Sequence, residues 1–276
     1  MTDLITADAP DIGPAAPQRA VVSMRNISKI FSNGTLALSD MSLDVMRGEF
    51  ISLLGPSGCG KSTALRIIAG LGAPSTGAIG WPSSTINARG LPEGDIGFVF
   101  QEPTLMPWQT VFGNVYLPLR LKGIGKAAAR DQIMETLDSV GLADFEKSYP
   151  RELSGGMKMR VSIARALVTS PKLLLMDEPF AALDEITRQK LNDDVLRLWR
   201  KSGVTVIFVT HSVFESAFLS NRIVVMKARP GQVFSDMEIS TSATRDENYR
   251  TSEEYRAVTD RVSRALHDAI HSGDAR

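Results

Sequence analysis

The feature that most constrains the fold is a glycine-rich segment that directly follows an apolar run. Residues 55–63 read GPSGCGKST and fit the pattern G-x-x-x-x-G-K-[ST], and Phe50–Leu54 before them read as a buried strand. The residues from 62 to 69 are predicted to form a helix. Glycines let such a loop wrap closely around a phosphate, and the helix N-terminus adds partial positive charge. The sequence therefore predicts a phosphate site on a strand–loop–helix unit.

Individual loop residues have distinct expected roles. Lys61 is expected to neutralise charge on the β- and γ-phosphates, the Ser62 hydroxyl to bind Mg²⁺, and Thr63 to reach the α-phosphate. The alternative is a glycine-rich turn that binds nothing, which leaves the lysine and the hydroxyl unexplained. The remaining predicted binding residues of the loop are Gly55, Pro56, Ser57, Gly58, Cys59 and Gly60.

A second apolar run ends in two carboxylates. Residues 173–176 (LLLM) precede Asp177 and Glu178. Asp177 is expected to hold Mg²⁺ through water, and Glu178 to orient the attacking water or accept its proton. An acidic pair at a strand end is common on its own, so this prediction depends on the phosphate loop beside it.

A third segment, Leu-Ser-Gly-Gly-Met at 153–157, precedes a predicted helix and the acidic strand. Ser154, with the backbone amides of Gly155 and Gly156, predicts a second anion site at a helix N-terminus. Simple helix capping is the alternative; it explains the serine but not the glycine pair.

The remaining pattern predicts an α/β fold. Apolar runs at 172–177, 204–210 and 222–227 read as strands of a mostly parallel sheet, with the last one closing the core. Residues 21–31 and 41–45 read as short strands, and 105–121 as a mixed segment interrupted by proline. Apolar residues recur at helical spacing from 255 to 270, and we expect this amphipathic helix to pack on the core rather than on a partner or a second copy.

Composition narrows the class of protein. Lys plus Arg and Asp plus Glu each number 31, so no net charge draws the chain to nucleic acid, and no nucleic-acid partner is expected. No apolar run is long enough to span a bilayer. Residues 1–20 are expected to form a disordered leader without a secretory pattern. The single cysteine, Cys59, excludes an intrachain disulfide and fits a reducing cytosol.

These motifs, in this order, resemble the ATP-binding subunit of an ABC transporter over about residues 21–232. The resemblance implies a RecA-like phosphate-loop ATPase core with an antiparallel β lobe and a helical subdomain at about 102–167. It implies an ATP-binding domain at 21–240, followed by a charged segment at 241–276 that ends in the amphipathic helix. It also implies ATP and Mg²⁺ as cofactors, and a head-to-tail dimer in which Ser154, Gly155 and Gly156 contact the ATP of the opposite copy. Met157 stands where the family usually has Gln.

Further residues take roles only from this resemblance. Gln101 resembles a glutamine that contacts Mg²⁺ or the attacking water, and His211 resembles a histidine that contacts the γ-phosphate across the dimer. Phe31 stands where the family stacks an aromatic ring on adenine, although a core-packing role is the alternative. Residues 182–184 resemble the loop that the family calls the D-loop.

Within the family, residues 101–115 and 180–188 look most like the importers of nitrate, sulfonates and taurine. This implies an ATPase on the cytoplasmic face of the inner membrane, bound peripherally to two membrane-spanning permease subunits and working indirectly with a periplasmic or extracellular solute-binding protein. The surface at 101–116, with Trp108 and Phe112, is expected to receive the permease. The alternative for 105–116 is packing in the core of the helical subdomain, and both can hold. The alternative is a soluble, non-transport ABC ATPase, which the single ATPase cassette and the short insertion disfavour. A generic kinase leaves the third segment unexplained, and a GTPase lacks its N-K-x-D motif.

Overall fold

The computed structural model describes residues 20–87, 90–92, 94, 96–240 and 244–272. The expected leader therefore lies outside the described residues except for Ala20, which begins the first strand. The largest element is a six-stranded sheet in which five neighbouring strands run parallel and the sixth, at one edge, is antiparallel. Its order is β5 (Ile96–Val99), β6 (Leu173–Asp177), β7 (Thr205–Thr210), β3 (Phe50–Leu54), β8 (Arg222–Lys227) and β9 (Gln232–Glu238). The α/β core expected from the sequence is confirmed.

The central strands are buried on both faces, which explains their unbroken apolar sequences. In β6, Leu174 and Met176 pack into one hydrophobic cluster, while Leu173 and Leu175 pack into another on the opposite face. This alternation follows from the two-residue period of an extended chain. Covering both faces of a parallel sheet is the usual arrangement, because the crossover helices lie on both sides.

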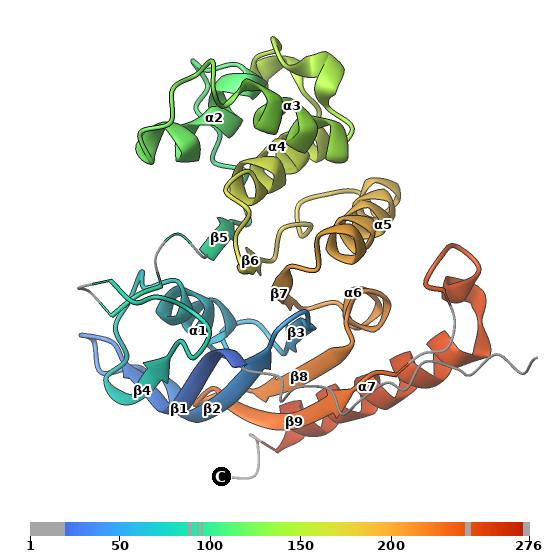
Figure 1. The fold of residues 1–276 in the computed structure, drawn as a ribbon. Coiled ribbons are helices and arrows are strands. Elements are labelled where there is room, and N and C mark those ends of the chain that lie inside the picture. The colour runs from blue at the N-terminus through green and yellow to red at the C-terminus, as the bar shows by residue number, and fades with distance from the viewer. Residues whose placement is uncertain (1–19, 88–89, 93, 95, 241–243, 273–276) are drawn as a thin grey trace, which may run out of the picture.

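One face of the sheet lies against α1 (Lys61–Ile68) and an antiparallel lobe of three strands (Figure 1). The lobe has the order β2 (Leu36–Met46), β1 (Ala20–Ile30) and β4 (Thr76–Gly80). The turn between β1 and β2 contains Gly34 at φ 81°, as the Asn-Gly pair indicates.

The segment between β5 and β6 forms a helical subdomain with its own core. It contains α2 (Val111–Leu121), α3 (Arg130–Ser139) and α4 (Gly155–Leu167), together with the short 3-10 turns Ala143–Phe145 and Pro150–Glu152. Val115, Ile133 and Val161 from the three α-helices are fully buried in a shared cluster. Figure 1 shows these helices at the end of the molecule opposite the β lobe. The segment 105–121 is mixed, as expected: it is a loop up to Thr110 and a helix from Val111, although α2 continues through Pro118 to Leu121 without a break.

The other face is covered by α4, α5 (Glu185–Ser202), α6 (Val213–Leu219) and α7 (Glu253–His271), with the short 3-10 turn Tyr249–Thr251 before α7. Tyr255, Val258 and Val262 of α7 are buried in the same cluster as Phe218 of α6. The amphipathic C-terminal helix therefore packs on the core, as predicted.

Residues 222–227 form β8, which is the last strand with fully buried residues, as expected of the strand that closes the core. The chain then turns at 229–231 and returns as the edge strand β9, which was not predicted and which pairs antiparallel with β8. Every residue of β9 is at least partly exposed, so this edge strand lacks the continuous apolar run that marks the central strands.

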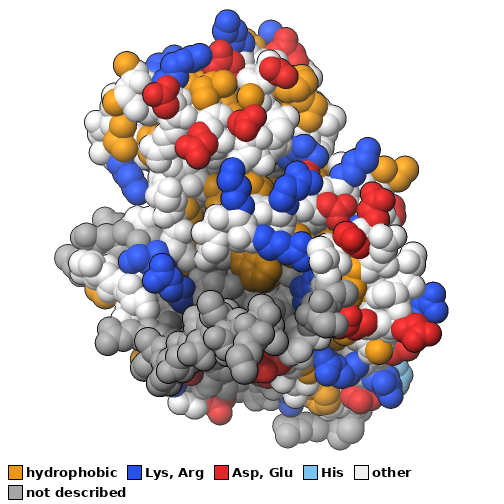
Figure 2. Space-filling view, turned by 45° about the vertical axis from the view of Figure 1, so that its right-hand side comes forward, with side chains coloured by type: hydrophobic (Ala, Val, Ile, Leu, Met, Phe, Trp, Pro, Cys, Tyr) orange, Lys and Arg blue, Asp and Glu red, His pale blue; other side chains and the backbone are white. Residues whose placement is uncertain are grey.

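Acidic and basic side chains are interspersed over the face shown in Figure 2. None of the helices among the described residues is long and apolar enough to cross a bilayer.

Candidate functional site

The glycine-rich loop joins the end of β3 to the start of α1, and its glycines are required by close contacts. Gly58 and Gly60 have φ values of 77° and 90°, which side-chain-bearing residues rarely adopt. A Cβ atom on Gly55 would lie 2.6 Å from the carbonyl oxygen of Met226, and one on Gly60 would lie 2.7 Å from that of Ala37. The loop is therefore held tightly between β8 and β2.

Lys61 is the buried cation of this loop. Its side chain is 4% exposed, and its ammonium group donates to the carbonyl oxygens of Gly55 at 2.8 Å and Pro56 at 3.1 Å. Its nearest carboxylate oxygen is Glu178 Oε1, at 3.8 Å. A buried ammonium bonded mainly to neutral carbonyls keeps unsatisfied charge, so an anionic phosphate is a better partner for it.

The Ser62 hydroxyl donates to Asp177 Oδ1 at 2.7 Å. Burial is the main reason that the pKa of Asp177 is raised, and the Ser62 hydrogen bond opposes the shift. A hydroxyl and a carboxylate side by side are the oxygen ligands that Mg²⁺ prefers, so these residues fit this ion. No group of three or more His, Cys, Asp and Glu side chains among the described residues could hold a metal, so an ion here needs phosphate and water for its other positions.

Glu178 stands between Lys61 and His211. Its backbone has φ 47°, and its N–H donates to the carbonyl of Val209 at 3.0 Å, which fixes the turn at the end of β6. Its Oε2 lies 3.5 Å from His211 Nδ1. Because β3, β6 and β7 are parallel, their C-terminal ends lie side by side, and the residues that follow them meet at this edge of the sheet. One copy of the chain thus brings together Lys61, Ser62, Asp177, Glu178 and His211.

Other predicted residues lie apart from this group. Ser154 caps α4 by accepting from the N–H of Met157 at 3.3 Å, and Ser154 and Gly155 are exposed. A Cβ on Gly156 would lie 2.7 Å from Thr187 Cγ2, so the glycine pair packs against the start of α5. Within the part of the chain that the structure describes, no hydrogen bond or ion pair joins Ser154 to the phosphate loop.

Phe31 and Gln101 are also exposed. The Phe31 ring is 45% exposed, and the Lys29 ammonium lies 5.8 Å from its centroid, so the ring is not part of the core. Gln101 follows β5, where Val99 pairs with Met176 of β6, so it emerges beside the strand that carries Asp177. Its side chain is exposed. Thr63 is half-buried in the first turn of α1.

Sequence reasoning missed two polar residues around His211. The Thr210 hydroxyl donates to the carboxylate of Glu215, and both side chains are buried. The one signal for them was a glutamate within the largely apolar segment of α6, VFESAFL.

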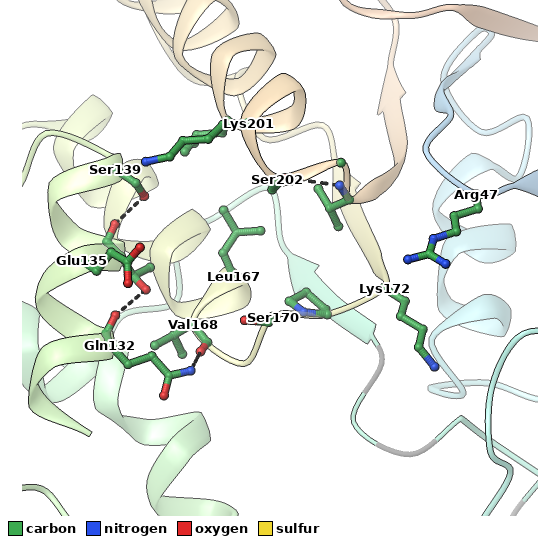
Figure 3. A pocket seen from close by; sticks show the side chains of 15 residues that line it. Arg47, Gln132, Glu135, Ser139, Leu167, Val168, Ser170, Lys172, Lys201 and Ser202 are labelled. Carbon is green, nitrogen blue, oxygen red and sulfur yellow. Dashed lines mark hydrogen bonds between the residues drawn. The ribbon is translucent and has the colours of Figure 1, made fainter. Parts of the chain in front are cut away.

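A cavity of about 510 Å³ lies elsewhere, at the opposite edge of the sheet (Figure 3). Its lining includes Lys172 just before β6 and Val204 just before β7, together with Gln132 and Ser139 of α3. Because these residues precede the strands, the cavity is separate from the phosphate loop, which follows β3.

Comparisons with known proteins place this arrangement in a family. A family model described as ABC transporter matches residues 38–181. An uncharacterized ABC transporter ATP-binding protein of Methanocaldococcus jannaschii is 44% identical over 252 residues, which cover 90% of this chain and 92% of that protein. The chain belongs to the ABC transporter family. It is an ATPase of this family.

Other similar proteins also belong to the ABC transporter family. The aliphatic sulfonates import ATP-binding protein SsuB of Bacillus subtilis is 44% identical over 225 residues, 82% of this chain and 85% of that protein. Among solved structures, cbiO1 from Clostridium perfringens, part of the ABC transporter complex cbiONQ, aligns with a TM-score of 0.74 at 28% identity over 90% of this chain and 98% of that one. A dimeric bacterial ABC transporter cassette aligns with a TM-score of 0.69 at 34% identity, covering 80% of this chain and 99% of that one.

The burial of Asp177 generates a prediction about stability. Since its pKa is raised in the fold, the folded chain holds more protons than the unfolded chain above pH 3.8, and stability falls as the pH rises through that range. At neutral pH the ionised carboxylate therefore costs stability. We expect Asp177→Asn, which can still accept the Ser62 bond, to raise the nucleotide-free Tm at pH 7.

The matched control is Asp138→Asn, an exposed carboxylate on α3, which should leave the Tm unchanged. The gain for Asp177→Asn should shrink as the pH falls toward 3.8. A variant less stable than the wild type at pH 7 would show that Asp177 is held by favourable interactions instead. Differential scanning calorimetry at several pH values measures this.

Proposed function

We propose that this chain is the ATP-hydrolysing subunit of an ABC importer, and that it couples ATP binding and hydrolysis to the uptake of a small solute. The observation that carries the proposal is the group formed by Lys61, Ser62, Asp177, Glu178 and His211 at one edge of the sheet. This group has a cation for phosphates, a hydroxyl–carboxylate pair and a carboxylate that can serve a water molecule. The ATP-binding domain in this proposal spans residues 21–240.

ATP binds with its phosphates along the loop. The glycine-rich backbone encloses the β-phosphate, and Lys61 exchanges its bonds to Gly55 and Pro56 for phosphate oxygens. Thr63 reaches the α-phosphate, and Phe31, whose exposed ring is free to stack, contacts the adenine. The other binding residues of the proposed site are Ser57, Gly58, Cys59, Gly60, Ser62 and, from the opposite copy, Ser154, Gly155 and Gly156.

Glu178 accepts a proton from the attacking water, which its position 3.8 Å from Lys61, the cation for the phosphates, supports. His211 lies 3.5 Å from the other carboxylate oxygen of Glu178 in the same copy, so it reaches the γ-phosphate of the ATP on its own chain, rather than across the dimer as the family resemblance implied. Ser62, Asp177 and Gln101 hold Mg²⁺. When bound, this ion neutralises charge on the phosphate oxygens.

Two copies enclose ATP head to tail. Ser154 and Gly155 are exposed at the N-terminus of α4 and separate from the loop of their own chain, so they are available to an ATP held by a second copy. Contacts that exist only in the closed dimer favour closure when ATP binds. A solved relative that is a dimeric ABC transporter cassette supports this arrangement.

Two permease subunits bind this dimer at the membrane. Trp108 is 70% exposed in the segment between β5 and α2, and Trp is a residue enriched at protein interfaces. Phe112, which was expected on the same surface, is instead buried in the core of the helical subdomain. cbiO1, which is part of an ABC transporter complex, supports such partners. The chain then lies peripherally on the cytoplasmic face of the inner membrane, and a solute-binding protein acts outside it.

The transported solute belongs to the class of nitrate, taurine and alkanesulfonates. The similarity to SsuB proteins of Bacillus subtilis and Bacillus cereus, named for import of aliphatic sulfonates, supports this class. The competing function is a soluble ATPase without a membrane partner.

The dimer is tested with Glu178→Gln. This change keeps the shape of the side chain but removes the proton acceptor, so ATP binding should persist while hydrolysis stops, and a stable dimer should accumulate. Light scattering after size exclusion, with and without ATP, measures this. Adding Lys61→Ala should abolish the ATP-driven dimer, because the buried cation for the phosphates is lost. A Glu178→Gln chain that stays monomeric with saturating ATP contradicts the proposal.

The membrane role is tested by mild detergent extraction of tagged Glu178→Gln from native membranes. Mass spectrometry should find a multi-span membrane protein in stoichiometric amount. Trp108→Ala should lose this partner but keep the ATP-driven dimer, whereas Leu71→Ala, an equally apolar change at another exposed position, should keep both. A chain that dimerises with ATP yet brings down no membrane protein supports the soluble ATPase.

A further inference from the structure

A single guanidinium connects the two loops that flank the catalytic edge of the sheet. Arg188, in the first turns of α5, donates to the carbonyl oxygen of Leu183 at 2.9 Å, in the loop that precedes this helix. The Nε atom of the same side chain lies 3.8 Å from Glu215 Oε1 in α6. Arg188 thus spans from the 182–184 loop to the segment that carries His211.

Glu215 in turn fixes the backbone on both sides of His211. Its Oε2 accepts from the Thr210 hydroxyl, and that hydroxyl accepts from the N–H of Ser212 at 3.0 Å. The N–H of Glu215 also donates to the Ser212 hydroxyl at 3.2 Å. His211 itself is 55% exposed, and among the described residues its side chain pairs only with Glu178, at 3.5 Å, so its position depends on these neighbours.

The carboxylate of Glu215 is buried, which is unfavourable for a charged group. The Glu215 side chain is 8% exposed, and burial raises its pKa. A buried charge is retained only where pairing offsets its desolvation, and an apolar side chain would cost less in such a helix. Arg188 Nε is also buried, and no hydrogen-bond partner for it exists among the described residues. The contact with Glu215 is therefore an ion pair without a hydrogen bond, and Arg188 Nη1 also lies 3.4 Å from Glu185 Oε2 on its own helix.

The other end of this connection lies against the Ser154 segment. A Cβ on Gly156 would lie 2.7 Å from Thr187 Cγ2, so the N-terminus of α4 packs closely on the first turn of α5, one residue before Arg188. A shift of the α4 N-terminus, such as one caused by an ATP bound to a second copy, therefore pushes on the turn that carries Arg188. Packed elements transmit such shifts because they are not compressible.

The C-terminal helix supports α6 from outside. The Tyr255 hydroxyl donates to the carbonyl oxygen of Phe214 at 3.0 Å, and Arg250 lies 3.7 Å from the ring centroid of Phe218 while pairing with Asp193 of α5 at 2.8 Å. These contacts hold α5 and α6 together beside the ion pair, so a movement of α5 is passed on to α6.

We propose that Arg188 and Glu215 are positioning residues that set His211 and Glu178 for hydrolysis according to the position of the 182–184 loop. The inference rests on the proposed ATPase dimer and adds to it the side chains that link the Ser154 segment to the catalytic carboxylate within one copy. Neither residue contacts ATP. Their loss therefore affects turnover and leaves nucleotide binding intact.

The test measures ATPase kinetics for Glu215→Gln, Arg188→Gln and the double variant. Each single variant should lower kcat at least about tenfold with KM within about twofold, since only an interaction used in the transition state is lost. The double variant should be no slower than either single one, because both changes break the same link. In the Glu178→Gln background, both should still form the ATP-driven dimer. The control Arg197→Gln removes an exposed guanidinium that pairs with the largely buried Asp194 on the same helix. It should match the wild type, because Arg160 still pairs with Asp194.

Several outcomes overturn the inference. These are an unchanged kcat for Glu215→Gln, effects of the two single variants that multiply in the double variant, or a KM that rises as much as kcat falls. If Glu215→Gln has a lower Tm that accounts for its loss of activity, Arg188→Lys decides. It keeps a positive charge, but one ammonium cannot hold Leu183 and Glu215 in the guanidinium's geometry, so kcat should still fall; full activity overturns the inference. If the wild type neither hydrolyses ATP nor dimerises as Glu178→Gln, the proposed function has failed instead.

Discussion

The hydrogen bond between Ser62 and Asp177 is the contact on which the site depends. It joins the first helix after the phosphate loop to the end of β6, although β7 lies between β3 and β6 in the sheet. The bond is possible because parallel strands end at a common edge, where a loop and a helix N-terminus can face a neighbouring carboxylate. The cost is a buried carboxylate whose pKa is raised. The nucleotide-free protein is therefore less stable than it would be with a neutral side chain at this position. Such a loss of stability is common at functional sites.

In the proposed dimer, one chain supplies only part of each ATP site. The edge of the sheet holds cations and carboxylates for phosphate chemistry, whereas the second helix N-terminus with its serine and glycine pair lies apart and exposed. A switch needs contacts that differ between two states, and a half-site that only a second copy can complete supplies them. In our further inference, the Arg188–Glu215 pair links the exposed half-site to the residues around Glu178 within one chain.

The elements that could be predicted from the sequence are those determined by residues close together in the chain. The strand–loop–helix at 50–69 and the runs that became β6 and β7 were recognisable, since burial on both faces requires unbroken apolar residues. The strand β4 was missed because it is short, partly exposed and contains two glycines, and β9 because none of its residues is fully buried. The role of His211 came only from family resemblance, which implied a γ-phosphate contact across the dimer; its place beside Glu178 of the same chain was not predicted. The Arg188–Glu215 pair had no local signal, since it joins two helices whose contact only the tertiary fold creates.

The central claim, that each ATP lies between the loop of one copy and Ser154 of the other, is tested most directly by mixing two inactive variants. Lys61→Ala disables the loop, and Ser154→Arg blocks the exposed helix N-terminus. A mixed dimer of the two contains one site with both parts intact, so the mixture should regain part of the wild-type ATPase rate while each variant alone stays inactive. If mixed dimers form but the mixture remains as inactive as its components, the ATP site does not combine parts of two copies and the account is wrong.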